Sequence, residues 1–271
     1  MTQFTRLDGD RKTRSTDLGE ILGSETEIAR ERWMWLTPHD DDAPFGGGLW
    51  MQAGQAAGAE QHILVVTDGR MGYCSASEKV RIVDVRAREA LQSFELLGLD
   101  ATRLSFLGFP DCQLDRWCGR RVARAGDSGV IEGYTGLQNA FTAHLRRVRP
   151  QRVFLPGAAD LHPDHQLVHR ELLISVYHAC GDIWPELGPP IPRPPRIYEM
   201  ALYCDFATPP NLELAADEEA FARKKEAMQC FRSQKQSAEA AALLAESGPY
   251  EYLHEFEFPR YRPAVYRARF Q

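Results

Sequence analysis

The sequence predicts an α/β fold with a doubly wound, mainly parallel sheet and helices on both faces. The first observation is an alternation of short apolar or β-branched runs with amphipathic segments of about 10–18 residues, which is typical of parallel sheets. The second is composition: 44% of the 271 residues are hydrophobic and 26% are charged. Such a chain can bury a sizeable core without disulfides or a structural metal. Because no repeat or interior linker divides the sequence, we expect a single domain over residues 25–271.

Residues 1–24 are polar and lack periodicity, so we interpret them as an N-terminal extension, an arm outside the domain. After this arm, runs that are apolar or β-branched and that end in turn residues predict strands. The clearest is HILVVT, which Asp68-Gly69 closes. The expected strands cover residues 32–37, 62–67, 103–108, 152–155, 197–204 and 252–258.

Helices are expected where apolar residues recur at helical spacing and a capping residue marks one end. Gly98, for example, is a natural C-cap for the helix that precedes it. The expected helices cover residues 46–57, 80–97, 137–147, 165–180, 218–231 and 238–245. Residues 110–135 contain four glycines and little periodicity, which indicates a long loop of the kind that is often functional. Strands and helices in this order indicate a Rossmann-like arrangement.

Charge and termini bear on partners and location. The formal net charge of -6 argues against a polyanionic partner, so we expect no nucleic acid. The first residues, MTQFTR, lack the apolar segment of a secretory signal. No apolar run approaches the roughly 20 residues that cross a bilayer. We therefore expect a cytoplasmic protein without a membrane partner.

The first motif with chemical content is Pro38-His39-Asp40-Asp41-Asp42, directly after the strand 32–37. In open α/β sheets, ligands bind at the carboxyl ends of strands. Three carboxylates beside a histidine would repel one another unless a cation lay among them. A solvated acidic turn that caps the next helix would also explain the motif. Taken alone, the motif fits both interpretations.

The second motif, Asp160-Leu161-His162-Pro163-Asp164-His165, directly follows the strand 152–155. If the two strands are parallel neighbours, both motifs lie at the same edge of the sheet. Two histidines and one aspartate then form the ligand set that is typical of a catalytic zinc or iron site with open positions. Considered jointly, the motifs favour a metal site over two unrelated surface loops.

These two motifs resemble those of the PIG-L/LmbE-like de-N-acetylases, a family of metal-dependent N-acetylglucosaminyl deacetylases. Its members carry an HPDD(E) motif after the first strand and an HPDH-type motif after a later strand. The resemblance covers residues 33–260. Further similar segments are Gly46-Gly47-Gly48, Val66-Thr67-Asp68-Gly69, Arg86–Glu89, Leu97-Gly98, Phe109-Pro110-Asp111, Lys225 and Ser233-Gln234.

The resemblance implies a metal site formed by His39, Asp42 and His165. Zinc is the default ion for such ligands, and Fe²⁺ would suit them as well. Two departures from the family pattern occur beside this site. Asp40 replaces the usual proline, and Ala43 replaces a frequent glutamate.

The resemblance also implies catalytic and substrate-binding roles. Asp41 would be the general base for the attacking water, although Asp40 could compete for that role. His162 would stabilise the oxyanion or protonate the departing amine, and Asp164 would orient it so that the ring can remain cationic. Substrate contacts are implied for Arg86 and Asp111.

We therefore expect a metal-dependent amide hydrolase that removes the acetyl group from an N-acetylglucosamine-type amino sugar or conjugate, a small-molecule substrate. Two alternatives remain: an amidase of a thiol conjugate or secondary metabolite, and a catalytically silent metal-binding module. The glycine run 46–48 is not the GxGxxG of a dinucleotide site. His169 is expected as a polar surface residue, and the tryptophans 33, 35 and 50 are expected in the core.

Overall fold

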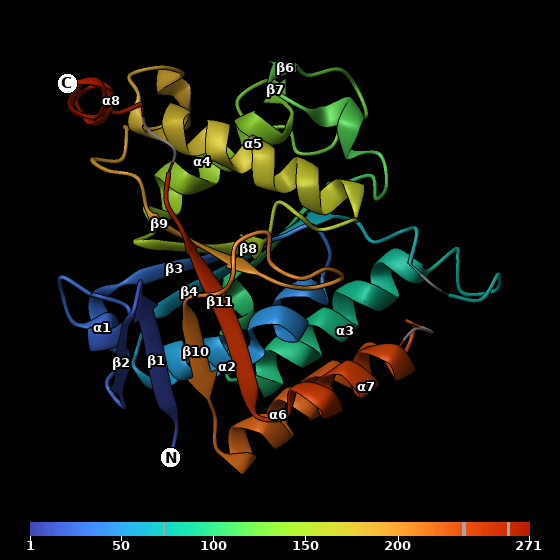
Figure 1. Ribbon diagram of the computed structural model, residues 1–271. Helices are drawn as coiled ribbons and strands as arrows, with labels where there is room; N and C mark the ends of the chain where they lie inside the picture. The colour runs from blue at the N-terminus through green and yellow to red at the C-terminus, as the bar shows by residue number, and fades with distance from the viewer. Residues whose placement is uncertain (73, 235–236, 259–260) are drawn as a thin grey trace.

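A computed structural model describes residues 1–72, 74–234, 237–258 and 261–271, and its main feature is one large sheet (Figure 1). Nine strands form it: β1 (Gln3–Asp8), β2 (Arg11–Ser15), β3 (Arg32–Thr37), β4 (Glu60–Thr67), β5 (Leu104–Phe109), β8 (Arg152–Pro156), β9 (Arg196–Met200), β10 (Leu212–Ala215) and β11 (Tyr250–Phe256). Their order across the sheet is β2-β1-β10-β11-β9-β8-β3-β4-β5.

Helices cover both faces of this sheet, as the sequence predicts. In Figure 1, α4 and α5 lie on one side of the strands, and α2, α3, α6 and α7 lie on the other. The helices are α1 (Leu18–Ile21), α2 (Asp42–Ala56), α3 (Ile82–Leu96), α4 (Leu137–Val148), α5 (Pro163–Cys180), α6 (Glu218–Met228), α7 (Ser237–Ser247) and α8 (Pro263–Phe270). Within the described residues, no helix is both long and apolar enough to cross a membrane.

Five adjacent strands, β9-β8-β3-β4-β5, run parallel. From β3 the chain proceeds to β4 and β5 on one side, and β8 and β9 are later added on the other. The order therefore reverses between β3 and β8, and open α/β sheets bind ligands at such a switch point, beyond the carboxyl ends of the strands. The predicted fold class is confirmed, and each expected strand and helix is present.

The remaining four strands, β11, β10, β1 and β2, are antiparallel. Two of them lie within residues 1–24, so these residues join the main sheet instead of forming the expected arm outside the domain. β1 pairs with both β2 and β10, and Phe4 is buried with its ring 5.8 Å from that of Trp50. The sheet ends here in β2, a polar edge strand, and Phe4 is the buried apolar side chain of its neighbour β1. The apolar periodicity that marks a buried strand is therefore absent from residues 1–24.

Close packing of α2 on β3 fixes the helix that follows the first motif. Trp33, Trp35 and Trp50 are fully buried in the core, as predicted. A Cβ atom at Gly47 would lie 2.9 Å from Trp35 Cη2 and 3.0 Å from Met200 Sδ. Only glycine fits at this position without displacement of the helix, so the glycine run serves helix–sheet packing.

The long loop expected at residues 110–135 contains some regular structure. Leu114–Trp117 forms a turn of 3₁₀ helix, and β6 (Arg121–Val122) pairs with β7 (Tyr134–Thr135) in a two-stranded ribbon. The guanidinium of Arg120 lies 3.6 Å from the centre of the Tyr134 ring. This loop therefore packs on its own side chains.

Candidate metal centre

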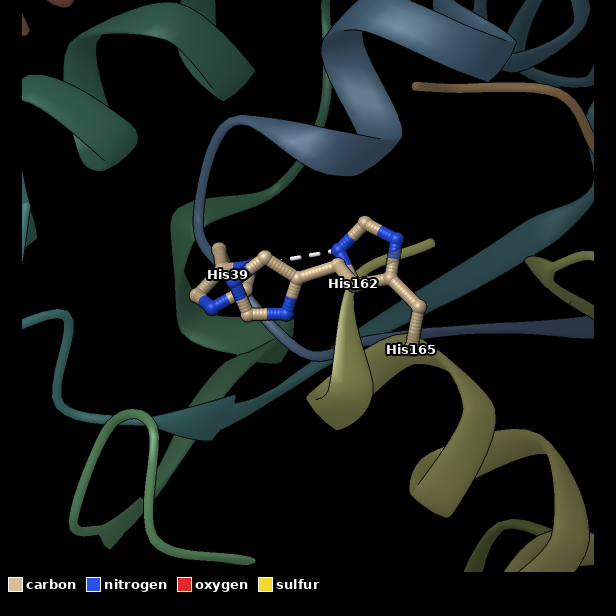
Figure 2. Close-up of side chains that lie close together, drawn as sticks. All are labelled: His39, His162 and His165. Atoms are coloured by element: carbon tan, nitrogen blue, oxygen red, sulfur yellow. Dashed lines mark hydrogen bonds between the residues drawn. The ribbon is translucent and has the colours of Figure 1, made fainter. Parts of the chain in front are cut away.

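The two motifs meet at the switch point of the sheet. His39 lies between the end of β3 and the start of α2, and Asp42 is the first residue of α2. His162 is the N-cap of α5, and His165 lies in the first turn of that helix after Pro163, which suits an initial helical position. Figure 2 shows the three histidine rings gathered between these two helix starts. Helix N-termini favour the negative charge of Asp42.

Three atoms of His39, Asp42 and His165 surround one point. Nδ1 of His39 is 3.2 Å from Nε2 of His165, and Oδ2 of Asp42 is 3.5 Å and 3.4 Å from these two nitrogens. Ligands of a tetrahedral zinc ion with bonds of about 2.0–2.1 Å lie about 3.3 Å apart. The triangle therefore has the size that a small divalent cation requires.

The carboxylates in and around this triangle favour positive charge at its centre. Burial alone would lower the pKa of His39, but the Asp42 charge and hydrogen bonds to Asp111 and Asp164 raise it well above its usual value. Burial also opposes the charged form of His165, yet Asp42 and Asp160 raise its pKa to about 9. Without a metal, protons supply the charge that these carboxylates attract, and a divalent cation can replace them.

Each of the two histidines has a carboxylate behind it. His39 Nε2 lies 3.1 Å from Oδ1 of Asp111 and 3.8 Å from Oδ2 of Asp164. His165 Nδ1 lies 3.1 Å from Oδ2 of Asp160. Such carboxylates hold a metal-binding imidazole in the required tautomer and orientation.

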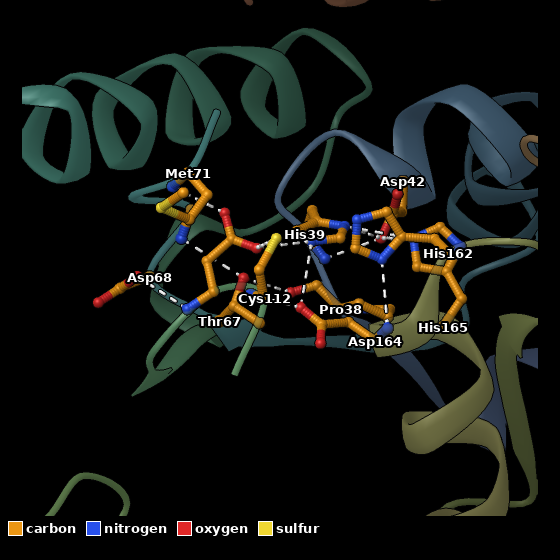
Figure 3. A network of polar contacts seen from close by, with 12 residues as sticks. Pro38, His39, Asp42, Thr67, Asp68, Met71, Cys112, His162, Asp164 and His165 are labelled. Carbon is orange, nitrogen blue, oxygen red and sulfur yellow. Dashed lines mark hydrogen bonds and ion pairs between the residues drawn. The ribbon is translucent and has the colours of Figure 1, made fainter. Parts of the chain in front are cut away.

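Asp111 and Asp160 thus have positions that the sequence does not reveal directly. Asp111, expected to contact substrate, is buried behind His39 and also accepts a hydrogen bond from the Met71 backbone N–H at 3.0 Å. In Figure 3, Met71 lies on one side of His39 and His165 lies on the other. Asp160 begins the second motif, but its spacing alone gives it no role. Oδ1 of Asp160 accepts the His162 N–H at 2.8 Å, and Oδ2 accepts the Tyr203 N–H at 3.2 Å.

His162 differs from expectation in two respects. Its Nδ1 accepts a hydrogen bond from the backbone N–H of Asp164, 3.2 Å away, whereas the Asp164 carboxylate accepts the N–H of Cys112 at 2.8 Å. The Asp164 side chain therefore does not orient the ring. Burial, followed by the charges of His39 and His165, lowers the pKa of His162, which favours a neutral ring over the expected cationic one. With Nδ1 as acceptor, the proton of the neutral ring lies on Nε2.

Arg86, the other expected substrate contact, is buried in an ion-pair network with the first motif. Its Nε donates to Oδ1 of Asp40 at 2.8 Å, its Nη2 contacts both Asp40 and Asp41, and its Nη1 donates to Gln234 at 3.1 Å. Burial, opposed by the Arg86 charge, raises the pKa of Asp40 to about 6. The side chain of Asp41 is 18% exposed, against 4% for Asp40, so Asp41 is the more accessible of the two carboxylates.

Apolar side chains are exposed next to the cluster. The Tyr203 ring stacks on His165 and His162, with ring centres 5.3 Å and 6.0 Å apart, and Tyr203 is nevertheless 55% exposed. Leu161, directly before His162, is 76% exposed. Burial and the charges of Asp42 and Asp41 raise the pKa of Tyr203, so its phenol stays neutral at physiological pH.

His169 is a further correction, because it is buried instead of lying on the surface. It follows His165 by one helical turn on α5, and its Nε2 lies 2.7 Å from Oε1 of Glu199 on β9. The other oxygen of Glu199 lies 2.9 Å from His254 Nδ1. Because Glu199 is 30 positions away, the local sequence gives no sign of this partner.

Several known proteins are related to this chain in sequence or in fold. A deacetylase of 1D-myo-inositol 2-acetamido-2-deoxy-alpha-D-glucopyranoside from Kineococcus radiotolerans is 27% identical over 208 residues, which are 70% of this chain and 57% of that protein. The chain thus spans little more than half the length of this relative. Two solved structures, each under 25% identical to this chain, share its fold.

One is a conserved protein of Thermus thermophilus (TM-score 0.65, 24% identity, 86% of this chain and 98% of the other). The other is the N,N'-diacetylchitobiose deacetylase of Pyrococcus horikoshii (TM-score 0.64, 22% identity, 92% of this chain and 91% of the other). The family model described as PIG-L, GlcNAc-PI de-N-acetylase, matches residues 34–176, and it includes both motifs and the strands that bring them together. Because this match covers more than half of the chain, the protein belongs to the PIG-L de-N-acetylase family.

Proposed function

We propose that this protein is a metal-dependent deacetylase that hydrolyses the N-acetyl group of an N-acetylglucosamine-type amino sugar or conjugate. The triangle of His39, Asp42 and His165 carries the proposal, because its edges of 3.2–3.5 Å fit one small cation. The resemblance of the chain to sugar deacetylases supports the substrate class. Zinc is the expected ion, with Fe²⁺ as the alternative for the same ligands.

His162 is close enough to be considered as a ligand in place of Asp42. One ligand atom each of His39, His162 and His165 lies within 4.8 Å of the others. However, Nδ1 of His162 is already bonded to the Asp164 N–H. Oδ2 of Asp42 lies within 3.5 Å of both other ligand nitrogens, which favours Asp42 as the third ligand.

The residues around this position have complementary roles in the proposed reaction. When bound, a divalent cation polarises the acyl oxygen and lowers the pKa of water to about 7. The Asp41 carboxylate takes the proton of the attacking water, and the water oxygen forms the new bond to the acyl carbon. His162 donates a hydrogen bond from Nε2–H to the oxygen on which negative charge develops.

The lowered pKa of His162 supports the assignment of proton transfer to Asp41 and of hydrogen-bond donation to His162. A neutral imidazole that gave up its Nε2 proton would become an anion, so it is a better hydrogen-bond donor than proton donor. Asp41, which has taken the proton of water, then delivers that proton to the nitrogen as the C–N bond breaks. Acetic acid and the free amine are the products, the acid releases its own proton to solvent to give acetate, and the carboxylate of Asp41 returns to its initial state.

The experiment that tests the proposal is amine release from N-acetylglucosamine conjugates by the zinc- or iron-loaded protein. Asp41→Asn should lower kcat by about 10²–10⁴ while one equivalent of metal stays bound, because the lost group is a base and not a ligand. Asp40→Asn tests the competing assignment. A larger loss for Asp40→Asn than for Asp41→Asn, with metal retained, would transfer the base role to Asp40.

Two other outcomes would change the function. If the loaded wild type releases no amine from any sugar conjugate, the amidase of other conjugates or the silent binding module becomes the better account. If the protein binds no metal at all, the central claim is wrong. Metal content is measured on the same samples, so that these two failures are distinguishable.

A further inference from the structure

We infer that Tyr203 and Leu161 form a specificity surface for an uncharged, apolar group on the amine side of the substrate. This inference rests on the proposed function and names its substrate class more closely: an amino-sugar conjugate that carries an apolar group and no phosphate near the acetamide. We call these two side chains the apolar wall.

Both residues of the apolar wall come from the edge of the sheet that holds the metal centre. Tyr203 follows β9 and Leu161 follows β8, so both come from the carboxyl edge of neighbouring parallel strands. The Tyr203 ring lies almost parallel to the His162 ring, at an interplanar angle of 28°. Leu161 is bonded directly to His162. Because the Tyr203 ring packs on His162 and His165, a substrate held at the metal position has one of its ends beside this ring.

Both side chains of the apolar wall are exposed to solvent. Large apolar side chains are usually exposed singly, and two of them beside a functional cluster indicate a binding surface. Leu161 is 76% exposed and Tyr203 is 55% exposed. The Tyr203 backbone is nevertheless fixed by its hydrogen bond to Asp160, so its ring is presented from a held main chain. A fixed aromatic ring binds C–H groups at little entropic cost.

The charge around the metal centre disfavours an anionic group on the substrate. Six carboxylates surround the cluster, those of Asp40, Asp41, Asp42, Asp111, Asp160 and Asp164. The guanidinium of Arg86 is already bonded to Asp40, Asp41 and Gln234, and Arg70 is paired with Asp68. Even with a divalent cation bound, the named groups remain net negative. A phosphate placed here would be repelled, whereas a neutral group would not.

The test compares three substrates with the zinc-loaded full chain: N-acetylglucosamine, its octyl glycoside, and the 6-phosphate of that glycoside. For the wild type, kcat/KM should be about tenfold higher for the octyl glycoside than for the free sugar. The 6-phosphate should be at least tenfold poorer at low salt, and added salt should reduce this difference.

Variants of the wall should remove the preference. In Tyr203→Ala and in Leu161→Ser, the ratio of kcat/KM between octyl glycoside and free sugar should fall towards one, mainly through KM. Tyr203→Phe should keep most of the ratio, because it retains the ring. Tyr177→Ala is the matched control: it removes a 72% exposed tyrosine at the other end of α5, twelve residues and about 18 Å beyond His165.

The possible failures are distinguishable. If no substrate releases amine, the proposed function itself fails. If the wild type treats octyl glycoside and free sugar alike, or prefers the 6-phosphate, the apolar wall does not select substrates. A purely structural role of Tyr203 would lower kcat/KM equally for both sugars and would weaken zinc binding, so the zinc affinity of each variant is measured in parallel.

Discussion

Removal of the Asp160 charge should weaken metal binding in a way that depends on pH. Oδ2 of Asp160 lies 3.1 Å from Nδ1 of His165, whose other ring nitrogen faces the metal position. Loss of such a supporting carboxylate typically reduces metal affinity about 10–100-fold, or about 1.4–2.7 kcal/mol. Asp160→Asn keeps the shape of the side chain, so we expect a loss within this range.

The pH dependence follows from proton competition at the same ring. The pKa of His165 in the metal-free protein is about 9, so a proton must leave when the metal binds at pH 7. Over two pH units this competition amounts to about 2.7 kcal/mol. After the charge of Asp42, the neighbouring Asp160 carboxylate is the next influence that raises this pKa. Asp160→Asn lowers it, which offsets part of the loss at pH 7 and none at pH 9.

Zinc affinity is measured by competition with a chromogenic chelator at pH 7, 8 and 9, and circular dichroism verifies the fold. The loss of affinity should grow from pH 7 to pH 9. Asp100→Asn serves as the control. Asp100 is half-exposed and precedes the amino end of β5, whereas the metal centre lies at the carboxyl ends of the parallel strands. Affinities that agree within twofold at pH 9, or a loss that does not change with pH, would refute the reasoning.

Three further predictions concern protons, packing and a buried ion pair. Zinc binding at pH 7 should release at least one proton, because His165 is protonated without metal; calorimetry in buffers of different ionisation enthalpy counts it, and zero release would contradict the argument. Gly47→Ala should destabilise the fold by about 2 kcal/mol in urea unfolding. Gly48→Ala should destabilise the fold less, since the nearest atom to its Cβ would be Cγ of Lys224 at 3.2 Å, a tight contact without overlap; equal effects would disprove this packing account. Glu31→Gln should cost about 3–5 kcal/mol, because it leaves Arg152 buried without its charged partner, 2.7 Å away. The pKa of Glu31 is lowered despite burial, chiefly by its hydrogen bond to Arg152. Its contribution is therefore present above the unfolded pKa and lost as pH falls through the folded value, which urea unfolding from pH 7 to pH 3 would show for the wild type and not for the variant.

The sequence predicts the parallel half of the sheet well for a physical reason. Strands buried on both faces, such as β3 with the run WMWL, have continuous apolar segments and stand out from their surroundings. The motif residues also follow these strands directly, so the position of His39 and His165 at one edge of the sheet could be deduced from chain order. Their mutual distances could not, because they depend on how two helix starts pack against each other.

The features of the structure that the sequence does not predict depend on contacts between residues that are distant in the chain or on polar edge strands. β2 consists of Arg11–Ser15 and contains no apolar residue, because it is an edge strand. The tie between Asp160 and Tyr203 joins residues 43 positions apart, and that between Arg86 and Gln234 joins residues 148 apart. Local periodicity carries no information about such partners. Roles that depend on them, as for Asp111 and His169, are therefore accessible only from the folded chain.

The strand pairing of β1 also has a consequence for biosynthesis. Thr5 lies opposite Glu213 in the sheet, 208 positions later in the chain. A ribosome that adds about 5–20 residues per second needs on the order of ten seconds or more to span that interval. Until β10 emerges, the β1–β2 hairpin has no neighbour on its inner edge, although β3, β4, β5 and β8 are synthesised before that point. The metal-binding half can thus assemble while the emerging chain still has an open edge, and this edge is where a chaperone would be needed first.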